Sequence, residues 1–105
     1  MDAQLKRGLL DVCVLASLYK KDSYGYNIIK ELSEFIEISE STLYPILKRL
    51  ESASFLVVYS MEYNGRLRKY YKITPSGKAR VREFLDDWST VMSVFNFIKE
   101  AQSDD

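Results

Sequence analysis

The segment Ser39-Glu-Ser-Thr-Leu-Tyr-Pro-Ile-Leu-Lys-Arg-Leu-Glu51 decides how the rest of the chain is interpreted. Its apolar residues recur at helical spacing, which predicts a helix with one buried face; they are Leu43, Ile46, Leu47 and Leu50. The opposite side carries Ser41, Thr42, Lys48 and Arg49. Hydroxyls followed by cations suit a DNA groove flanked by phosphates. An ordinary amphipathic helix with a solvated face has the same pattern, so the neighbouring segments must decide.

The residues before this segment predict a second short helix. A polar break at residues 20–23 offers Asp22 or Ser23 as its N-cap. The helix is expected from about Tyr24 to Phe35, with Phe35 facing inward, and Gly25 in its first turn allows close backbone approach. Two short helices joined by a tight turn, the second with a polar outer face, form the helix-turn-helix arrangement.

Either Ser39 or Ser41 could be the N-cap of the helix at residues 39–51, and the sequence does not decide between them. If Ser41 is the N-cap, Pro45 ends the first turn and removes one hydrogen bond. If Ser39 is the N-cap, Pro45 is interior and should kink the helix near its start. Tyr44 lies at the border between the apolar and the polar face. This position fits a core residue and a DNA contact about equally well.

Two strands and a tight turn are expected next. Residues 55–62 and 68–74 are rich in β-branched and aromatic side chains, and Asn64-Gly65 between them favours a two-residue hairpin turn. This register pairs Tyr59 with Tyr70, and Val58 with Tyr71 on the other face. The cations at or just behind the tip are Arg66, Arg68 and Lys69. A basic hairpin directly after a helix-turn-helix predicts a DNA-binding wing, against the alternative of charges placed for solubility.

The two ends of the chain are helical in pattern. Gln4–Tyr19 is apolar most of the way round, as in a helix buried on two sides. Thr74 and Pro75 are suitable N-cap and first residues of a last helix that continues to about Ala101. Its apolar stripe exceeds what a small winged helix can bury, so we expect a homodimer. The expected interface residues are Leu85, Trp88, Met92, Phe95 and Ile98.

These elements predict a mainly α fold with a small β-hairpin (α+β). Residues 1–75 would form a winged helix-turn-helix DNA-binding domain, and residues 76–105 a dimerisation helix with a short tail. The net charge is zero, but residues 41–72 carry six cations against two acids. An approaching polyanion meets this local field first. Zero net charge slightly favours the alternative function, a winged-helix protein-interaction module that does not bind DNA.

Other functions find little support in the residue types. The chain has no histidine and a single cysteine, Cys13, in an apolar run. Histidine-dependent catalysis and most zinc sites are therefore excluded, and we expect no enzyme activity, no metal and no cofactor. A lone cysteine cannot form an internal disulfide, and no apolar run is long enough to span a bilayer. We expect a soluble, cytoplasmic protein.

The chain resembles the PadR family of bacterial winged-helix transcriptional regulators, in its compact subgroup with a single C-terminal helix. The resemblance rests on Tyr24-Gly25-Tyr26, on residues 41–51, on Arg68-Lys69-Tyr70-Tyr71 and on Thr74-Pro75-Ser76-Gly77. It implies a two-fold dimer that represses genes from a palindromic operator and leaves DNA when an effector binds. The implied DNA contacts are Thr42, Tyr44 and Lys48 on the third helix, and Arg66, Arg68 and Lys69 on the wing. Many members have glycine where Ser41 and Ser54 stand.

An effector site is implied by the same resemblance. In one multidrug-binding subgroup, a tryptophan from each last helix stacks on planar aromatic ligands between the subunits. Trp88 falls at that place, with Asp11 and Val12 nearby. A tryptophan on a heptad stripe also packs well at an interface without any ligand, which is the more common situation.

Overall fold

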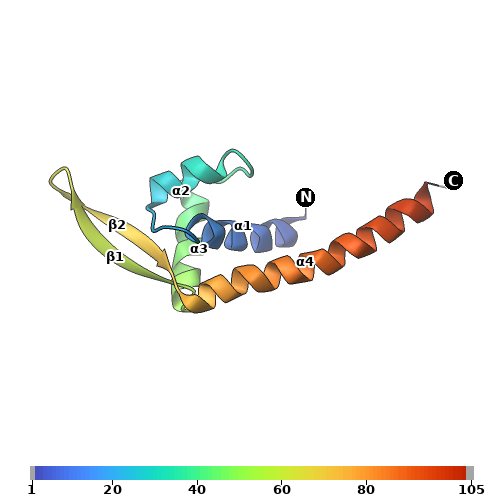
Figure 1. The fold of residues 1–105 in the computed structure, drawn as a ribbon. Coiled ribbons are helices and arrows are strands. Elements are labelled where there is room, and N and C mark those ends of the chain that lie inside the picture. Colours follow the sequence, from blue (N-terminus) through green and yellow to red (C-terminus); the bar gives the residue numbers. More distant parts are fainter. Residues whose placement is uncertain (1, 104–105) are drawn as a thin grey trace.

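The computed structural model describes residues 2–103, which form four helices and one antiparallel hairpin (Figure 1). The elements are α1 (Ala3–Ser17), α2 (Gly25–Leu32), α3 (Glu40–Ser52), β1 (Leu56–Tyr63), β2 (Arg66–Ile73) and α4 (Pro75–Gln102). This order confirms the predicted α+β winged helix with a long last helix. No helix within these residues has the length and apolar character that a membrane span requires.

The core lies where α1, α2, α3 and the base of the hairpin meet. The predicted apolar face of α3 is buried in full, at Leu43, Ile46, Leu47 and Leu50. It packs with Leu15 of α1, Ile28 of α2 and Leu56 of β1, none of which is more than 1% exposed. Each such side chain contributes roughly 1.5–3 kcal/mol to folding through burial. This packing holds α3 against the domain by its apolar face and leaves its polar face outward.

Helix α3 begins after Ser39, so Pro45 is an interior residue. Ser39 does not cap the backbone with its side chain; its hydroxyl instead lies 3.0 Å from the Ser41 hydroxyl and 3.2 Å from that of Thr42. Because proline has no N–H, the Ser41 carbonyl loses its usual helical partner. Both Ser41 and Pro45 are exposed, so this carbonyl lies on the solvent side.

Helix α2 differs from the prediction at both ends. Its N-cap is Tyr24, not Asp22 or Ser23. Ser23 is engaged elsewhere: its amide and carbonyl form a β-bridge with Tyr71 of β2, at 3.2 and 2.8 Å, so the chain stays extended through residue 23. The helix also ends at Leu32, and Phe35, expected to face inward, is 81% exposed.

The hairpin has the predicted register. Tyr59 lies opposite Tyr70 and Val58 opposite Tyr71. Asn64 and Gly65 have φ values of 52° and 78°, as a turn of this kind requires. Ser54, just after α3, also has a positive φ of 64°. Glycine adopts a positive φ without a Cβ penalty. This is the physical reason why many members of the family that the sequence resembles have glycine where Ser54 stands. We call β1, β2 and their turn the wing.

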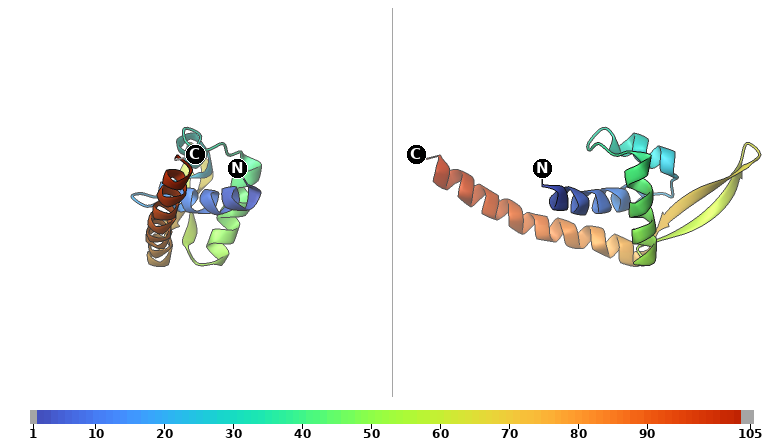
Figure 2. Two further views of the ribbon diagram at one scale, coloured as in Figure 1. Left: turned by 90° about the vertical axis from the view of Figure 1, so that its right-hand side faces the viewer. Right: turned by 180° about the vertical axis from the view of Figure 1, so that it is seen from behind.

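Helix α4 starts as predicted and then leaves the domain. The Thr74 hydroxyl accepts a hydrogen bond from the Gly77 amide at 3.1 Å, and Pro75 is the first helical residue. The first half of α4 packs against α1, with Val81 buried. From Ser89 to Gln102 every residue is exposed. Figure 2 shows this part running past the N-terminus, away from the wing, and residues 104–105 of the predicted tail lie outside the described residues.

Gly77 is required where α4 begins. A Cβ at this position would lie 2.1 Å from the Phe55 carbonyl oxygen and 2.7 Å from a side-chain carbon of Ile73. We therefore predict that Gly77→Ala lowers the free energy of unfolding by about 1–3 kcal/mol, as overpacking does. Gly8→Ala in α1 is the matched control, because nothing lies within 4 Å of its added Cβ; it should be neutral or stabilise by up to about 1 kcal/mol. Urea unfolding of both variants measures this, and equal stability of the two would contradict the packing described.

Candidate nucleic-acid interface

The outer face of α3 presents the side chains that the sequence placed there. Ser41, Thr42, Tyr44 and Lys48 are all exposed. They lie on the N-terminal two-thirds of the helix, opposite the buried leucines. A helix held by its apolar face and exposing small hydroxyls and a lysine has the shape and chemistry to enter a major groove.

The wing and α3 share a groove. Its walls include Tyr44 and Lys48 from α3, and Lys69 and Tyr71 from β2. Side chains alternate along a strand, so Lys69 and Tyr71 face α3 whereas Arg68 and Tyr70 face the other way. Two lysines, one from each element, therefore border the same groove, and the basic wing and the polar helix form one surface.

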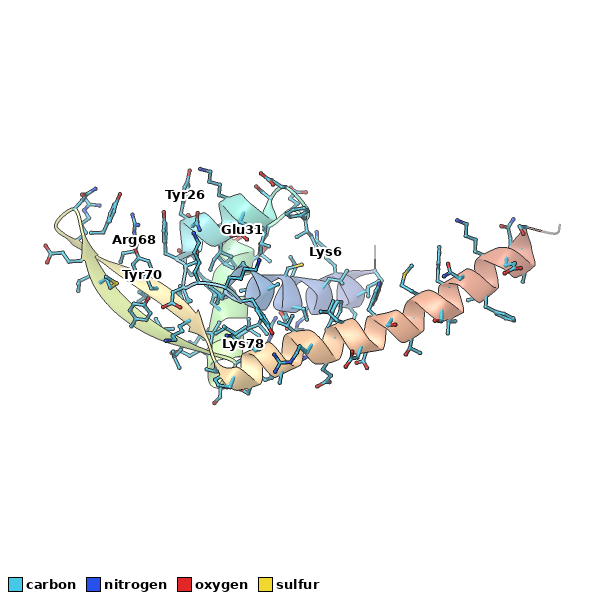
Figure 3. The ribbon with its side chains drawn as sticks, in the orientation of Figure 1. Lys6, Tyr26, Glu31, Arg68, Tyr70 and Lys78 are labelled. Atoms are coloured by element: carbon cyan, nitrogen blue, oxygen red, sulfur yellow. The ribbon has the colours of Figure 1, made fainter. Side chains whose placement is uncertain are left out.

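Arg68 is held by aromatic rings. Its guanidinium carbon lies 4.0 Å from the centroid of the Tyr24 ring and 3.7 Å from that of Tyr63. The guanidinium also donates to the Tyr70 hydroxyl at 3.5 Å, and this hydrogen bond is the main reason why the pKa of Arg68 is raised. Figure 3 shows Arg68 and Tyr70 on the side of the wing nearest α2. Tyr24 precedes α2, so this tyrosine cage (Tyr24, Tyr63 and Tyr70) joins the wing to the helix-turn-helix.

A second contact joins the same parts. The Tyr59 hydroxyl donates to the Asp22 carboxylate at 2.6 Å, and this bond raises the pKa of Tyr59. The Tyr70 ring stacks on Tyr59 at 5.7 Å and meets Tyr24 edge-on at 5.6 Å. The face of the wing that turns away from α3 is thus packed against residues 22–24.

Tyr44 is both a packing residue and a surface residue. A Cβ on Gly25 would come within 2.7 Å of the Tyr44 hydroxyl, so the ring lies directly over the start of α2. The same side chain is 48% exposed and lines the groove toward the wing. The missing side chain of Gly25 makes room for Tyr44.

Arg49 has a partner within the chain. The sequence predicts Arg49 on the DNA-facing side of the helix, but its guanidinium forms an ion pair with Asp11 of α1 at 2.5 Å. Both side chains are about one-third exposed, so we assign the pair little stabilising energy. Asp11 was expected in the effector site with Val12, but Val12 is buried in the core. Trp88 stacks on Phe84 of its own helix at 5.6 Å.

Two further cations, which were not among the predicted DNA contacts, also lie beside α3. Lys6 and Arg7 of α1 line a groove with Thr42, Pro45 and Arg49, on the side of α3 away from the wing. The only signal in the sequence was the adjacent basic pair itself. Nothing in the periodicity of α1 indicates that this pair lies next to α3, because that depends on how the two helices cross.

A helix-turn-helix whose second helix shares one surface with a basic hairpin defines the winged helix-turn-helix class of proteins. Within that class, the chain belongs to the PadR-like family of transcriptional regulators, whose family model matches residues 14–83. A family of regulators confirms the expectation that the protein is not an enzyme.

Individual relatives agree with this family. The chain is 32% identical to the transcriptional regulator Rv3488 of Mycobacterium tuberculosis over 76% of each protein. It is similar to a Streptococcus transcriptional regulator at 32% identity, with a TM-score of 0.82 over 93% of this chain and 99% of that one. It also resembles Bacillus subtilis PadR, solved with operator DNA, at 27% identity and a TM-score of 0.66 over 72% of this chain and 46% of that one.

Proposed function

We propose that the protein is a homodimeric transcriptional repressor that binds operator DNA with α3 in the major groove. The observation that carries this proposal is the placement of cations on both sides of the outer face of α3. Lys48 and Lys69 border the groove on the wing side, and Lys6 and Arg7 border the groove on the α1 side. The two phosphate backbones flank a helix in the major groove in the same way.

Residue roles follow from these positions. Ser41 and Thr42 reach the base edges from the exposed face of α3, and Lys48 contacts the phosphate backbone beside the groove on the wing side. Lys69 and Arg66 of the wing contact phosphates beside it. Arg68 acts mainly by holding the wing, since its guanidinium lies against two tyrosine rings. Arg49 shares its charge with Asp11, so it contributes less to DNA binding than a free cation would.

Replacing the two groove lysines tests the DNA interface. For DNA that the wild-type protein selects from a random-sequence library, we expect Lys48→Gln/Lys69→Gln to weaken binding. We also expect the slope of log affinity against log salt to fall by about 1.8, because each lost phosphate contact removes about 0.9. Titrations at several salt concentrations measure the slope.

The matched control is Lys20→Gln/Lys21→Gln, which makes the same change in charge on the loop between α1 and α2, away from α3. Its slope should stay at the wild-type value. Lys6→Gln/Arg7→Gln should behave like the groove pair if α1 also contacts phosphates. A wild-type protein that selects no DNA at low salt would overturn the proposed function and favour a protein-interaction module.

The dimer is proposed from the uncovered stripe on α4. Leu85, Met92, Phe95 and Ile98 are each at least 43% exposed, and Trp88 is half-buried beside them. These residues recur every three or four positions, as in helices that pack on one another. A second copy of the chain presents the same stripe, and a two-fold axis lets the two stripes cover each other. We further propose that residues 76–105 act as the dimerisation unit and that the operator is palindromic, with half-sites roughly 34 Å apart.

A charge in the stripe should separate the dimer. We predict that Phe95→Glu raises the dimer dissociation constant by more than about thirtyfold, as loss of a central interface side chain does. Ser93→Glu is the control, because Ser93 is also exposed but lies outside the stripe. Sedimentation velocity across a range of concentrations measures both. Dimers of equal strength in the two variants would show that the stripe is not the interface.

We also propose that a planar aromatic effector binds beside Trp88 in the dimer. The support is the parallel stack of Trp88 and Phe84, with an interplanar angle of 16°, which offers a flat aromatic surface. Trp88 is the only tryptophan, so emission reports on this site alone. A planar aromatic cation should quench the emission of the wild type and have little effect on monomeric Phe95→Glu. Unchanged emission across a panel of such cations would rule the site out.

A further inference from the structure

The first backbone amides of α2 have no hydrogen-bond acceptor among residues 2–103. The N-cap Tyr24 is extended, with φ −130° and ψ 163°, and its side chain caps no amide. The first N–H groups of a helix have no intrahelical acceptors, and the first bond of this kind here is from Ile28 to the Tyr24 carbonyl, at 2.9 Å. The amides of Gly25 and Tyr26 therefore stand at the positive end of the helix dipole.

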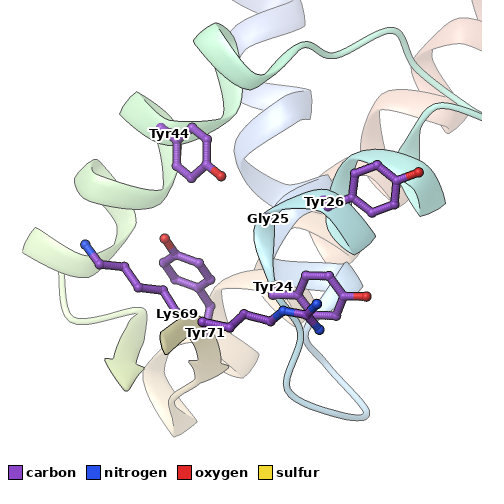
Figure 4. A pocket seen from close by; sticks show the side chains of 7 residues that line it. Tyr24, Gly25, Tyr26, Tyr44, Lys69 and Tyr71 are labelled. Atoms are coloured by element: carbon purple, nitrogen blue, oxygen red, sulfur yellow. The ribbon is translucent and has the colours of Figure 1, made fainter. Parts of the chain in front are cut away.

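This helix end opens into a pocket shared with α3 and the wing. Besides Tyr24, Gly25 and Tyr26, its walls are Tyr44 of α3 and three residues of β2, Arg68, Lys69 and Tyr71 (Figure 4). The polar groups on these walls are hydroxyls, backbone amides and two cations. None of the lining residues is an acid, and Glu51 lies in the neighbouring groove. Such a set of groups favours an anion.

Tyr71 supplies an independent indication of a ligand. Its side chain is only 6% exposed and lines the pocket, yet its hydroxyl makes no hydrogen bond with any residue that the structure describes. Figure 4 shows this hydroxyl directed toward Tyr44, across the pocket. Burial, together with the nearby Tyr44 and Glu51, raises the pKa of Tyr71, so the hydroxyl keeps its proton at neutral pH. No side-chain polar atom of the described residues is both fully buried and unpaired, so the Tyr71 hydroxyl reaches the open space of the pocket and can donate a hydrogen bond to a ligand there.

The pocket is continuous with the DNA-facing groove. Tyr44, Lys69 and Tyr71 line both the pocket and the groove that contains Lys48. An anion in the pocket would lie beside the outer face of α3, where a DNA backbone would run. This position favours a phosphate within a polymer over a free small anion.

We propose that this pocket holds one phosphate of the DNA backbone in each half-site. The amides of Gly25 and Tyr26, the Tyr71 hydroxyl and the Lys69 ammonium group donate to it. Since the donors come from α2 and β2, and Tyr44 of α3 lies over them, one phosphate fixes three elements relative to the DNA. Such contacts set register and orientation without reading sequence. The inference rests on the proposed function, because it requires that the protein bind DNA.

A coupling experiment tests the phosphate site. The full-length protein first selects DNA from a random-sequence library, and each phosphate of the selected site is then replaced by a neutral methylphosphonate in turn. At one position in each half-site, the replacement should weaken wild-type binding by about tenfold, as loss of a charge-assisted hydrogen bond does. At that position the replacement should weaken DNA binding by Tyr71→Phe clearly less, since the hydroxyl that donates to the phosphate is already absent.

Tyr59→Phe is the matched control. It also removes one tyrosine hydroxyl of the wing, but that hydroxyl donates to Asp22. At every phosphate, the methylphosphonate replacement should weaken DNA binding by Tyr59→Phe as much as it weakens binding by the wild type. If Tyr71→Phe unfolds more readily than the wild type, Lys69→Gln serves as the second variant and should show the same coupling.

The outcomes separate the two proposals. The protein could select DNA in which no methylphosphonate weakens binding by Tyr71→Phe or Lys69→Gln less than binding by the wild type. That result would overturn the phosphate site and leave the proposed function intact. Failure to select any DNA would overturn the proposed function and the phosphate site with it. Coupling at one phosphate per half-site supports both.

Discussion

The contact between Arg68 and its tyrosine cage is the one on which the DNA-facing surface depends. A two-stranded hairpin is at best marginally stable by itself in water. Here the base of the wing is secured by Leu56, Tyr71 and Ile73 in the core, but every residue from Ser60 to Leu67 is exposed. Arg68 lies between these two regions and stacks on Tyr24, just before α2. This contact keeps the wing beside α3, where Lys48 and Lys69 border one groove.

Local rules predicted much of the fold. The helical spacing of Leu43, Ile46, Leu47 and Leu50 was sufficient for the buried face of α3. The Asn64-Gly65 turn determined the strand register, and Thr74-Pro75 determined where α4 begins. Each of these features depends on residues that are close together in the sequence. The family resemblance, carried by the same segments, agreed with the family model and with the solved structures.

The sequence could not predict contacts between residues that are far apart in the chain. Arg49 was assigned to DNA, but it pairs with Asp11, 38 residues away. The bridge between Ser23 and Tyr71 moved the N-cap of α2 to Tyr24, which no local capping preference predicts. Tyr44 could not be assigned until Gly25 was seen beneath its ring. Similarly, Lys6 and Arg7 became candidates only once α1 was seen to lie next to α3.

The most direct test of the account concerns Arg68 itself. Arg68→Lys keeps the positive charge but loses the planar group that lies against the tyrosine rings. In amide hydrogen exchange of the DNA-free protein, the amides of residues 61 and 68, which lie opposite each other in a hydrogen-bonded pair of the hairpin, should exchange about two- to fivefold faster, as loss of an exposed cation–π contact implies. The control Arg66→Lys, at the turn, should leave exchange unchanged. Unaltered protection of the wing in Arg68→Lys would contradict the claim that the tyrosine cage holds the wing beside α3.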